Sequence, residues 1–117
     1  MTQKQITIKQ IQDWERNFCK EKGITFDKDE QMRIALLKLM EEVGETAKAV
    51  LEKEWDDILA EVADVIVFAC KVANVTEDNY TKDKLEKVMK RKLSYCEGRI
   101  YDAKIRKFNK PKNSEFK

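Results

Sequence analysis

The chain has 117 residues, of which 39% are charged, and its net charge at neutral pH is +2. It contains one proline and three glycines, so few residues interrupt helices and the composition favours an all-α domain. Histidine is absent, which excludes Ser-His-Asp and Cys-His catalysis and also zinc or di-iron sites built with imidazole. Any metal site would use oxygen ligands, which favours magnesium or manganese.

Cysteine use and the lack of leader sequences indicate the compartment. The three cysteines lie far apart and are odd in number, which is typical of reduced thiols rather than disulfides. The N-terminal segment lacks the apolar stretch of a secretion signal, and no apolar run has the length of a membrane span. We therefore expect a cytoplasmic protein without a membrane partner.

Hydrophobic spacing and capping residues predict four helices in a single domain. Thr7 is placed to cap a first helix that runs to about Lys22, where Gly23 ends it. Apolar side chains recur in this segment at helical spacing, and we expect Trp14 among them to lie in the core.

A second and a third helix are predicted on either side of a short polar turn at 52–54. Asp27 begins a capping-box pattern ahead of a helix over residues 28–51. The next helix, over residues 55–74, is almost continuously apolar and is expected at the centre of a bundle. The short turn favours an antiparallel helical hairpin.

The last part of the chain is expected to be helical and basic. Residues 75–81 are predicted to form a linker, followed by a fourth helix over 82–106 with apolar residues on one side and basic residues on the others. The folded domain would then span 1–107, and 108–117 would be a basic, disordered tail. The predicted fold is all-α and four-helix bundle-like.

Two acidic clusters lie inside the most apolar of these helices. Glu42 and Glu45 are three residues apart, as are Glu61 and Asp64, so each pair shares one helix face. In an antiparallel hairpin the two pairs can meet. Carboxylates this close repel one another and are costly to bury unless a cation neutralises them. The clusters therefore indicate a site for a hard divalent cation, whose remaining ligands are commonly waters and phosphate oxygens.

A competing structural interpretation is that these acids are solvated or paired with nearby cations. Lys38, Lys48 and Lys71 are the candidate partners. A single glutamate in a helix would favour that interpretation, because surface ion pairs are common. Four acids in two matched pairs on apolar helix faces favour the metal site.

The acidic clusters also match a family pattern. Residues 41–45 (EEVGE) and 61–64 (EVAD), with fifteen residues between them, resemble the two motifs of the MazG-like all-α nucleoside triphosphate pyrophosphohydrolases. The similarity covers roughly residues 10–102. It implies an enzyme that hydrolyses a nucleoside triphosphate, including a deoxynucleotide, to the monophosphate and pyrophosphate in nucleotide-pool housekeeping. It further implies a Mg²⁺ cofactor, replaceable by Mn²⁺, and a homodimer or homotetramer whose subunits complete the bundle.

The resemblance also implies roles for particular residues. By position in the motif, Glu42, Glu45, Glu61 and Asp64 would hold the metal. Glu41 would be an outer ligand or would orient the attacking water. All five would therefore belong to the catalytic site.

A basic stretch follows the acidic helices in this family, with a Lys, an Asn four residues later and an Arg three residues after that. Here these positions are Lys92, Cys96 and Arg99. Lys92 and Arg99 match and would bind phosphates. Cys96 replaces the Asn, so one hydrogen bond to the sugar or a phosphate is expected to differ. Without the acidic motif, a solvated basic face would explain Lys92 and Arg99 equally well.

Base recognition is expected among aromatic side chains near the first helix, as in relatives that prefer dCTP. Phe68, Phe26 and Asn17 occupy comparable places along the chain. Phe68 follows Asp64 by one turn and could stack on a base beside the metal, or belong to the core. The preferred base and sugar are not fixed by the sequence.

The alternative function is that of a non-catalytic helical bundle, an interaction or regulatory module that retains the fold. Such a module would release no pyrophosphate from any nucleotide. Binding of nucleic acid to the basic fourth helix is a third hypothesis, and the nearly neutral net charge makes it the least favoured.

Overall fold

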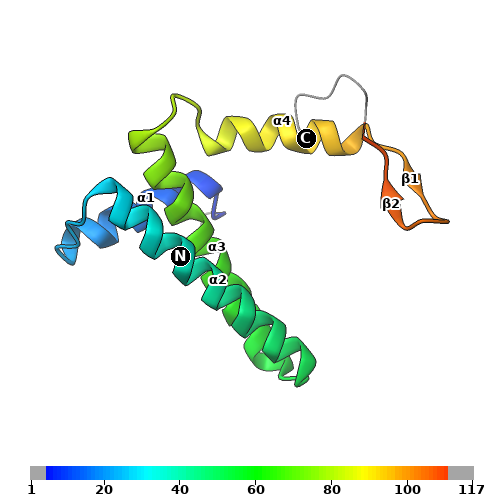
Figure 1. Cartoon of the computed structure of the whole chain (residues 1–117), viewed down its shortest axis with the longest axis horizontal. Helices are drawn as coiled ribbons and strands as arrows, with labels where there is room; N and C mark the ends of the chain where they lie inside the picture. The colour runs from blue at the N-terminus through cyan, green and yellow to red at the C-terminus, as the bar shows by residue number, and fades with distance from the viewer. Residues whose placement is uncertain (1–4, 111–117) are drawn as a thin grey trace. The chain divides into compact units, whose positions relative to one another are not determined.

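The computed structural model describes residues 5–110. Within these residues, four helices precede a small antiparallel hairpin. Figure 1 shows the course of the chain through these elements. Contacts divide the chain into two compact units, residues 1–82 and 83–117, which are described separately below. The all-α class is confirmed. The elements are α1 (Ile8–Glu21), α2 (Lys28–Leu51), α3 (Trp55–Asn79), α4 (Leu85–Glu97), β1 (Tyr101–Asp102) and β2 (Lys107–Phe108).

Local capping chemistry fixes the limits of α1. The Thr7 hydroxyl accepts the Gln10 N–H at 3.1 Å, and the Gln10 side chain accepts the Thr7 N–H at 2.8 Å, which completes a capping box. At the other end, Gly23 has a φ of +68°, a conformation that glycine adopts without strain. Both predicted ends of this helix are confirmed.

The helices α2 and α3 form the predicted hairpin and lie side by side (Figure 1). The Asp27 carboxylate accepts the Glu30 N–H at 2.8 Å and caps α2. The turn at 52–54 contains Lys53 with a φ of +57°, which reverses the chain within three residues. The predicted limits of α2 and the predicted start of α3 at Trp55 are confirmed.

The helix α3 continues to Asn79, five residues beyond its predicted end at Asn74. The predicted linker over 75–81 is therefore wrong for 75–79. Asn74 and Val75 are buried, with 2% and 4% of their surface exposed. Helical structure persists because this part of α3 packs against α1, a contact that local polarity does not reveal.

Small side chains make up the buried apolar core of the first unit, and large ones stay accessible. Trp14 is 54% exposed, so the expectation that it lies in the core is wrong. It stacks on Phe18 with 5.0 Å between the ring centroids. The buried apolar residues are Ala35, Ala49, Cys70 and Val75.

In the second unit, α4 ends at Glu97 rather than at 106, so the predicted length of this helix is wrong. Gly98 caps it, and a two-residue antiparallel pairing follows, with Tyr101 opposite Phe108. Asn109 closes this hairpin because its side chain accepts the Ile100 N–H at 2.7 Å. Phe108 thus lies in a strand, and residues 111–117 of the predicted tail fall outside the described residues.

None of the helices within residues 5–110 combines the length and apolar character needed to cross a membrane.

Candidate active site

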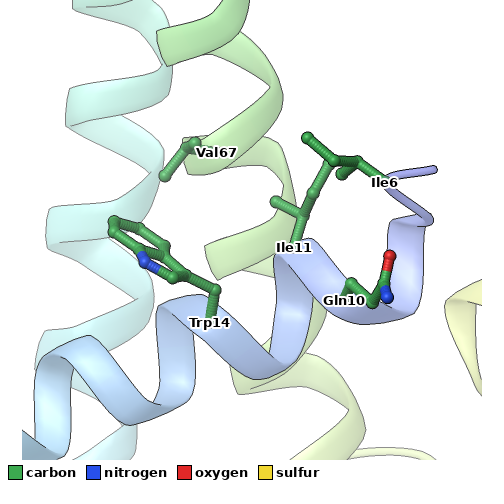
Figure 2. Close-up of a pocket in the computed structure, with 5 residues that line it drawn as sticks. All are labelled: Ile6, Gln10, Ile11, Trp14 and Val67. Carbon is green, nitrogen blue, oxygen red and sulfur yellow. The ribbon is translucent and has the colours of Figure 1, made fainter. Parts of the chain in front are cut away.

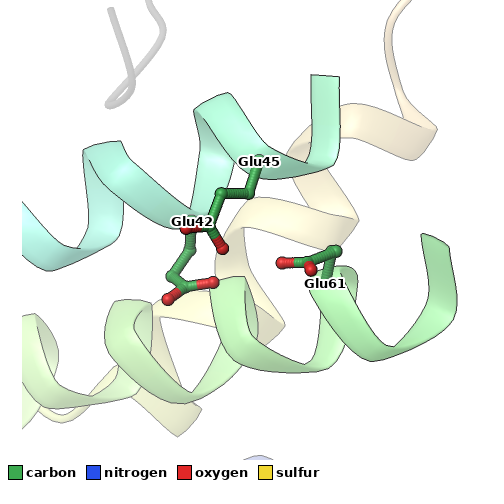
Figure 3. A group of neighbouring side chains, drawn as sticks. All are labelled: Glu42, Glu45 and Glu61. Atoms are coloured by element: carbon green, nitrogen blue, oxygen red, sulfur yellow. The ribbon is translucent and has the colours of Figure 1, made fainter. Parts of the chain in front are cut away.

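Three carboxylates converge between α2 and α3 (Figure 3). Glu42 and Glu45 lie one turn apart on α2, and Glu61 lies on α3. Each contributes a carboxylate oxygen, and these oxygens lie within 4.8 Å of one another. The helical hairpin therefore brings together side chains that are up to nineteen residues apart in sequence, as the antiparallel arrangement predicted. We call Glu42, Glu45 and Glu61 the carboxylate cluster.

Two oxygens of the carboxylate cluster are buried without compensation. Oε2 of Glu42 and Oε2 of Glu61 have no hydrogen-bond partner within the part of the chain that the structure describes. Buried polar atoms in folded proteins are almost always paired with a donor or an ion. The cluster consequently has unused capacity to coordinate a cation.

The electrostatics of the cluster follow from this crowding. Burial, together with the nearby carboxylates of Glu45 and Asp64, raises the pKa of Glu42 to about 7. Burial and the neighbouring Glu45 also raise the pKa of Glu61 above its ordinary value. Mutual repulsion of this kind is relieved either by protons or by a divalent cation.

Two of the three lysines considered as partners for the acids pair with other carboxylates. Lys38 forms an ion pair with Glu41, with 3.3 Å between the charged atoms. Lys71 forms one with Glu15, also at 3.3 Å. Two of the three candidate partners for the acids are thus committed to other carboxylates.

The two remaining acidic residues of the motif lie outside the cluster. Asp64 follows Glu61 by one turn on α3, and its carboxylate contributes to the raised pKa values of Glu42 and Glu61. It also lines an adjacent cavity. The Glu41 side chain is 52% exposed and pairs with Lys38. Asp64 is therefore near the cluster, whereas Glu41 faces a neighbouring lysine.

The adjacent cavity has a volume of about 420 Å³ and lies between α1, α2 and α3. We call it the aromatic cavity because Trp14, Phe18, Phe26 and Phe68 line it. The structure brings two predicted base-binding residues, Phe26 and Phe68, to the same cavity as Asp64. The third, Asn17, is exposed and does not line it.

A second cavity, of about 450 Å³, shares Trp14 and Val67 with the aromatic cavity. Figure 2 shows Ile6, Gln10 and Ile11 around its other side. Its lining is largely aliphatic, and none of the carboxylate cluster reaches it. Trp14 therefore lines both cavities, and the second cavity adds no charged side chain to the candidate site.

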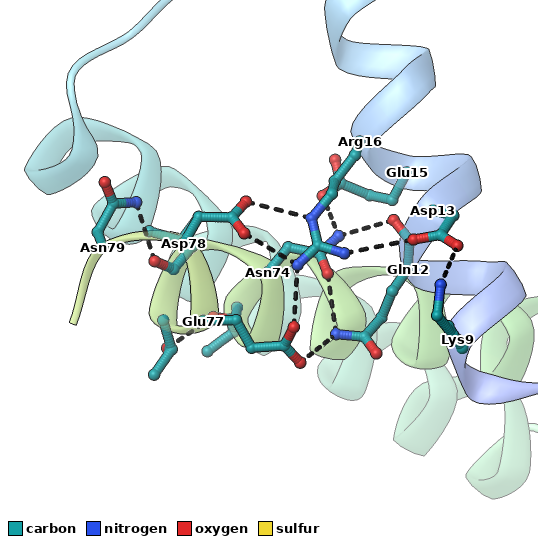
Figure 4. Close-up of polar contacts among 12 residues, drawn as sticks. Lys9, Gln12, Asp13, Glu15, Arg16, Asn74, Glu77, Asp78 and Asn79 are labelled. Atoms are coloured by element: carbon teal, nitrogen blue, oxygen red, sulfur yellow. Dashed lines mark hydrogen bonds and ion pairs between the residues drawn. The ribbon is translucent and has the colours of Figure 1, made fainter. Parts of the chain in front are cut away.

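A buried polar network joins α1 to α3 (Figure 4), and the sequence had not pointed to it. Gln12 donates to Asn74 Oδ1 at 2.9 Å, and Asn74 donates to the Gln12 carbonyl at 2.9 Å and to Glu15 at 3.0 Å. Arg16 pairs with Glu77 at 3.0 Å. Matched polar positions on the two helices were the available signal, but pairing them requires knowing that the helices touch.

The second unit contains the three residues of the basic stretch that the family resemblance places near the phosphates. Lys92 and Cys96 lie on α4, and Cys96 is exposed. Arg99 follows the helix and donates to the backbone carbonyls of Asn109 at 2.6 Å and Phe108 at 3.2 Å. Arg99 thus fastens the hairpin within its own unit, and the phosphate-binding roles remain predictions.

Comparison with known families agrees with this arrangement. A model of the MazG nucleotide pyrophosphohydrolase domain matches residues 31–99, which is more than half of the chain and includes both acidic motifs. No curated protein and no solved structure gave a significant match. On the strength of the family match, the chain belongs to the MazG nucleotide pyrophosphohydrolase family.

Proposed function

We propose that this protein hydrolyses a nucleoside triphosphate, with deoxynucleotides among the candidates, to the monophosphate and pyrophosphate in a Mg²⁺-dependent reaction. The family supports a nucleotide pyrophosphohydrolase. The observation that carries the metal dependence is the pair of buried, partnerless oxygens of Glu42 and Glu61 beside Glu45. Nucleotide-pool housekeeping is the role that fits this activity.

The chemistry of the donors fits a hard cation. Glu42, Glu45 and Glu61 offer carboxylate oxygens only, and Mg²⁺ prefers such ligands together with waters and phosphate oxygens. Asp64, one turn from Glu61, would be the fourth ligand, and Mn²⁺ would substitute for Mg²⁺. When bound, the cation neutralises charge on the phosphates and lowers the pKa of a bound water.

The remaining predicted site residues have roles in the proposed reaction. A water oxygen attacks the α-phosphorus, the bond to the oxygen that bridges to the β-phosphorus breaks, and pyrophosphate leaves. Glu41 would orient the attacking water or act as an outer ligand. Lys92 and Arg99 would bind phosphate oxygens, with Cys96 in the position that relatives give to Asn.

The aromatic cavity would hold the base. Phe68 and Phe26 line it together with Asp64, so a stacked base would lie next to the metal ligands. Asn17, which lies outside this lining, is the weakest of the base-recognition assignments. The base position is therefore supported by two of the three predicted residues.

A homodimer or homotetramer is part of the proposal. Large apolar side chains remain at least half exposed on α2 and at least one third exposed on α3. Exposed apolar patches of this kind commonly mark protein–protein contacts. The residues are Leu36, Leu37, Met40 and Val43 on α2, and Leu59, Val62 and Ile66 on α3.

The decisive experiment is a pyrophosphate-release assay on the purified full chain with all standard ribonucleoside and deoxyribonucleoside triphosphates. We expect release that needs Mg²⁺ or Mn²⁺ and stops when the metal is chelated. A non-catalytic module would release none from any nucleotide. Release that persists under chelation would contradict the metal site while leaving the activity intact.

A further inference from the structure

One wall of the aromatic cavity is charged and buried. Lys71 Nζ lies 3.3 Å from Glu15 Oε2 and 3.1 Å from Cys19 Sγ, and all three residues line the cavity. The side chains of Lys71 and Glu15 are only 11% and 8% exposed. A buried ion pair is an expensive way to stabilise a small domain, because desolvation offsets most of the attraction. Its place on a ligand cavity therefore calls for a functional explanation.

One face of α3 lines this cavity over two turns of the helix. Asp64, Val67, Phe68 and Lys71 all line it, at the i, i+3, i+4 and i+7 spacing of one helix face. At 1.5 Å per residue, Asp64 and Lys71 are separated by roughly 10 Å along the axis. Phe68 lies between them. A nucleotide with its phosphates at the Asp64 end and its base beside Phe68 would present the far edge of the base to Lys71.

Hydrogen bonding at this wall leaves a donor on Lys71. An ammonium has three N–H groups. Lys71 uses two of them, one to Glu15 and one to Cys19. Among the described residues, this leaves one N–H available to a ligand. Both oxygens of Glu15 already accept, from Asn74 on one side and from Cys19 and Lys71 on the other.

We propose that Lys71, held in place by Glu15, is a specificity-determining residue that selects nucleotides whose base carries an oxo group on the edge opposite the sugar. This inference rests on the proposed function and names its substrate class. The class comprises 4-oxo pyrimidines, as in UTP and dTTP, and 6-oxo purines, as in GTP. A carbonyl oxygen accepts a charge-assisted hydrogen bond from the ammonium.

The amino bases are disfavoured for the converse reason. Cytosine and adenine carry an amino group at the same edge, so they would direct an N–H at the ammonium. A site built to donate one hydrogen bond rejects a ligand that cannot accept it, because the buried donor is left unpaired. The neutral Phe and Trp side chains would stack on either kind of base and would not discriminate.

The test compares substrates within each variant. In the wild-type protein, kcat/KM for UTP over CTP, and for GTP over ATP, should both exceed about tenfold, the usual effect of one charge-assisted hydrogen bond. Lys71→Gln alone would leave Glu15 buried and uncompensated, so Glu15→Gln is added to remove both charges together. In this double variant both ratios should fall toward one. The variant that combines Arg16→Gln with Glu77→Gln is the matched control, because this ion pair belongs to the same helix interface and neither residue lines the aromatic cavity.

A purely structural role gives a different result. If Lys71 only stabilises the interface, the double variant would lower kcat/KM for all substrates alike and leave both ratios unchanged. That result would overturn the inference, as would a wild-type preference for CTP or ATP.

Product binding separates this inference from the proposed function. Uridine 5′-monophosphate and cytidine 5′-monophosphate are titrated into the metal-free protein by calorimetry. Tighter binding of the uridine nucleotide, lost in the double variant, supports the inference even if no triphosphate is hydrolysed. Equal binding, or no binding of either, overturns it even if pyrophosphate is released.

Discussion

Glu42 on α2 and Glu61 on α3 converge with Glu45 in one carboxylate cluster. Each has a buried carboxylate oxygen that lacks a hydrogen-bond partner among the described residues. An apolar pair at these positions would pack without this cost. The arrangement therefore favours binding of a cation at the expense of the stability of the metal-free fold.

Removing one of these charges should lower the activity and raise the stability of the metal-free protein. We expect Glu61→Gln to lower Mg²⁺-dependent pyrophosphate release about 100-fold or more, since even outer partners of metal ligands commonly contribute 10- to 100-fold. The same change should raise the midpoint of thermal unfolding without metal, because it removes repulsion with Glu45. Steady-state kinetics and calorimetry measure the two effects.

Glu30→Gln is the matched control for this variant. Glu30 also lies on α2, but it pairs with Arg33 on the surface. Its replacement should leave turnover and the Mg²⁺ requirement unchanged. Wild-type turnover in Glu61→Gln would remove Glu61 from the metal site.

The stability of the metal-free protein should depend on pH through Glu42. Its pKa is raised from an ordinary value of 4.5 to about 7 in the folded state, so the folded protein binds this proton more tightly than the unfolded chain does. The resulting stabilisation is complete below about pH 4.5 and is lost as the pH rises through 7.

This effect is measured as the difference in the free energy of unfolding between wild type and Glu42→Gln across that pH range. The subtraction cancels groups that titrate alike in both proteins, such as Glu15. Wild type should lose stability relative to the variant as the pH rises, and saturating Mg²⁺ should reverse the trend. A difference that is independent of pH would contradict the raised pKa.

The sequence predicted those features that depend on neighbours along the chain. The caps at Thr7 and Asp27 and the spacing of Glu42 and Glu45 are local patterns, and the structure agrees with each. Pairing Glu61 with them needed one further step, the short turn at 52–54.

Features that depend on distant contacts could not be predicted. The continuation of α3 past Asn74 follows from burial against α1, and the Lys71–Glu15 pair joins residues 56 positions apart. The predicted helix over 82–106 runs past Glu97 because apolar residues continue at helical spacing through Ile100. The hairpin that forms there depends instead on Arg99 and Asn109, which pair across the loop.

Asn74 should be important for the stability of the first unit. It is 2% exposed, and replacing it with alanine would leave Gln12 and Glu15 without hydrogen bonds that they now make. Lost bonds of this type cost about 1–3 kcal/mol. Chemical denaturation of Asn74→Ala measures the loss. Asn79→Ala is the control and should cost far less, since among residues 5–110 the Asn79 amide donates only to the Val75 carbonyl within α3.

Arg99 should hold the hairpin of the second unit together. Its guanidinium donates to the carbonyls of Asn109 and Phe108 and lies 5.5 Å from the centre of the Phe108 ring. In Arg99→Ala, amide hydrogen exchange should accelerate at 107–109 while α2 and α3 remain protected. Arg106→Ala is the control on the same hairpin. Unchanged exchange at 107–109 would show that strand pairing and Asn109 suffice without Arg99.

If the exposed apolar faces of α2 and α3 form the oligomer interface, one aspartate substituted there should dissociate the oligomer. Met40 and Leu59 are 65% and 78% exposed, so replacing either with aspartate should not disturb the packing of one chain. In an oligomer that covers these faces, the new carboxylate would be desolvated, and the assembly should dissociate to monomers. Light scattering after size-exclusion chromatography measures the mass, and circular dichroism confirms retained helix.

Ile105→Asp, on the hairpin loop and 63% exposed, is the control and should leave the mass unchanged. A monomeric wild-type protein would contradict the proposed oligomer. Met40→Asp and Leu59→Asp variants with undiminished mass would place the interface away from these two helices.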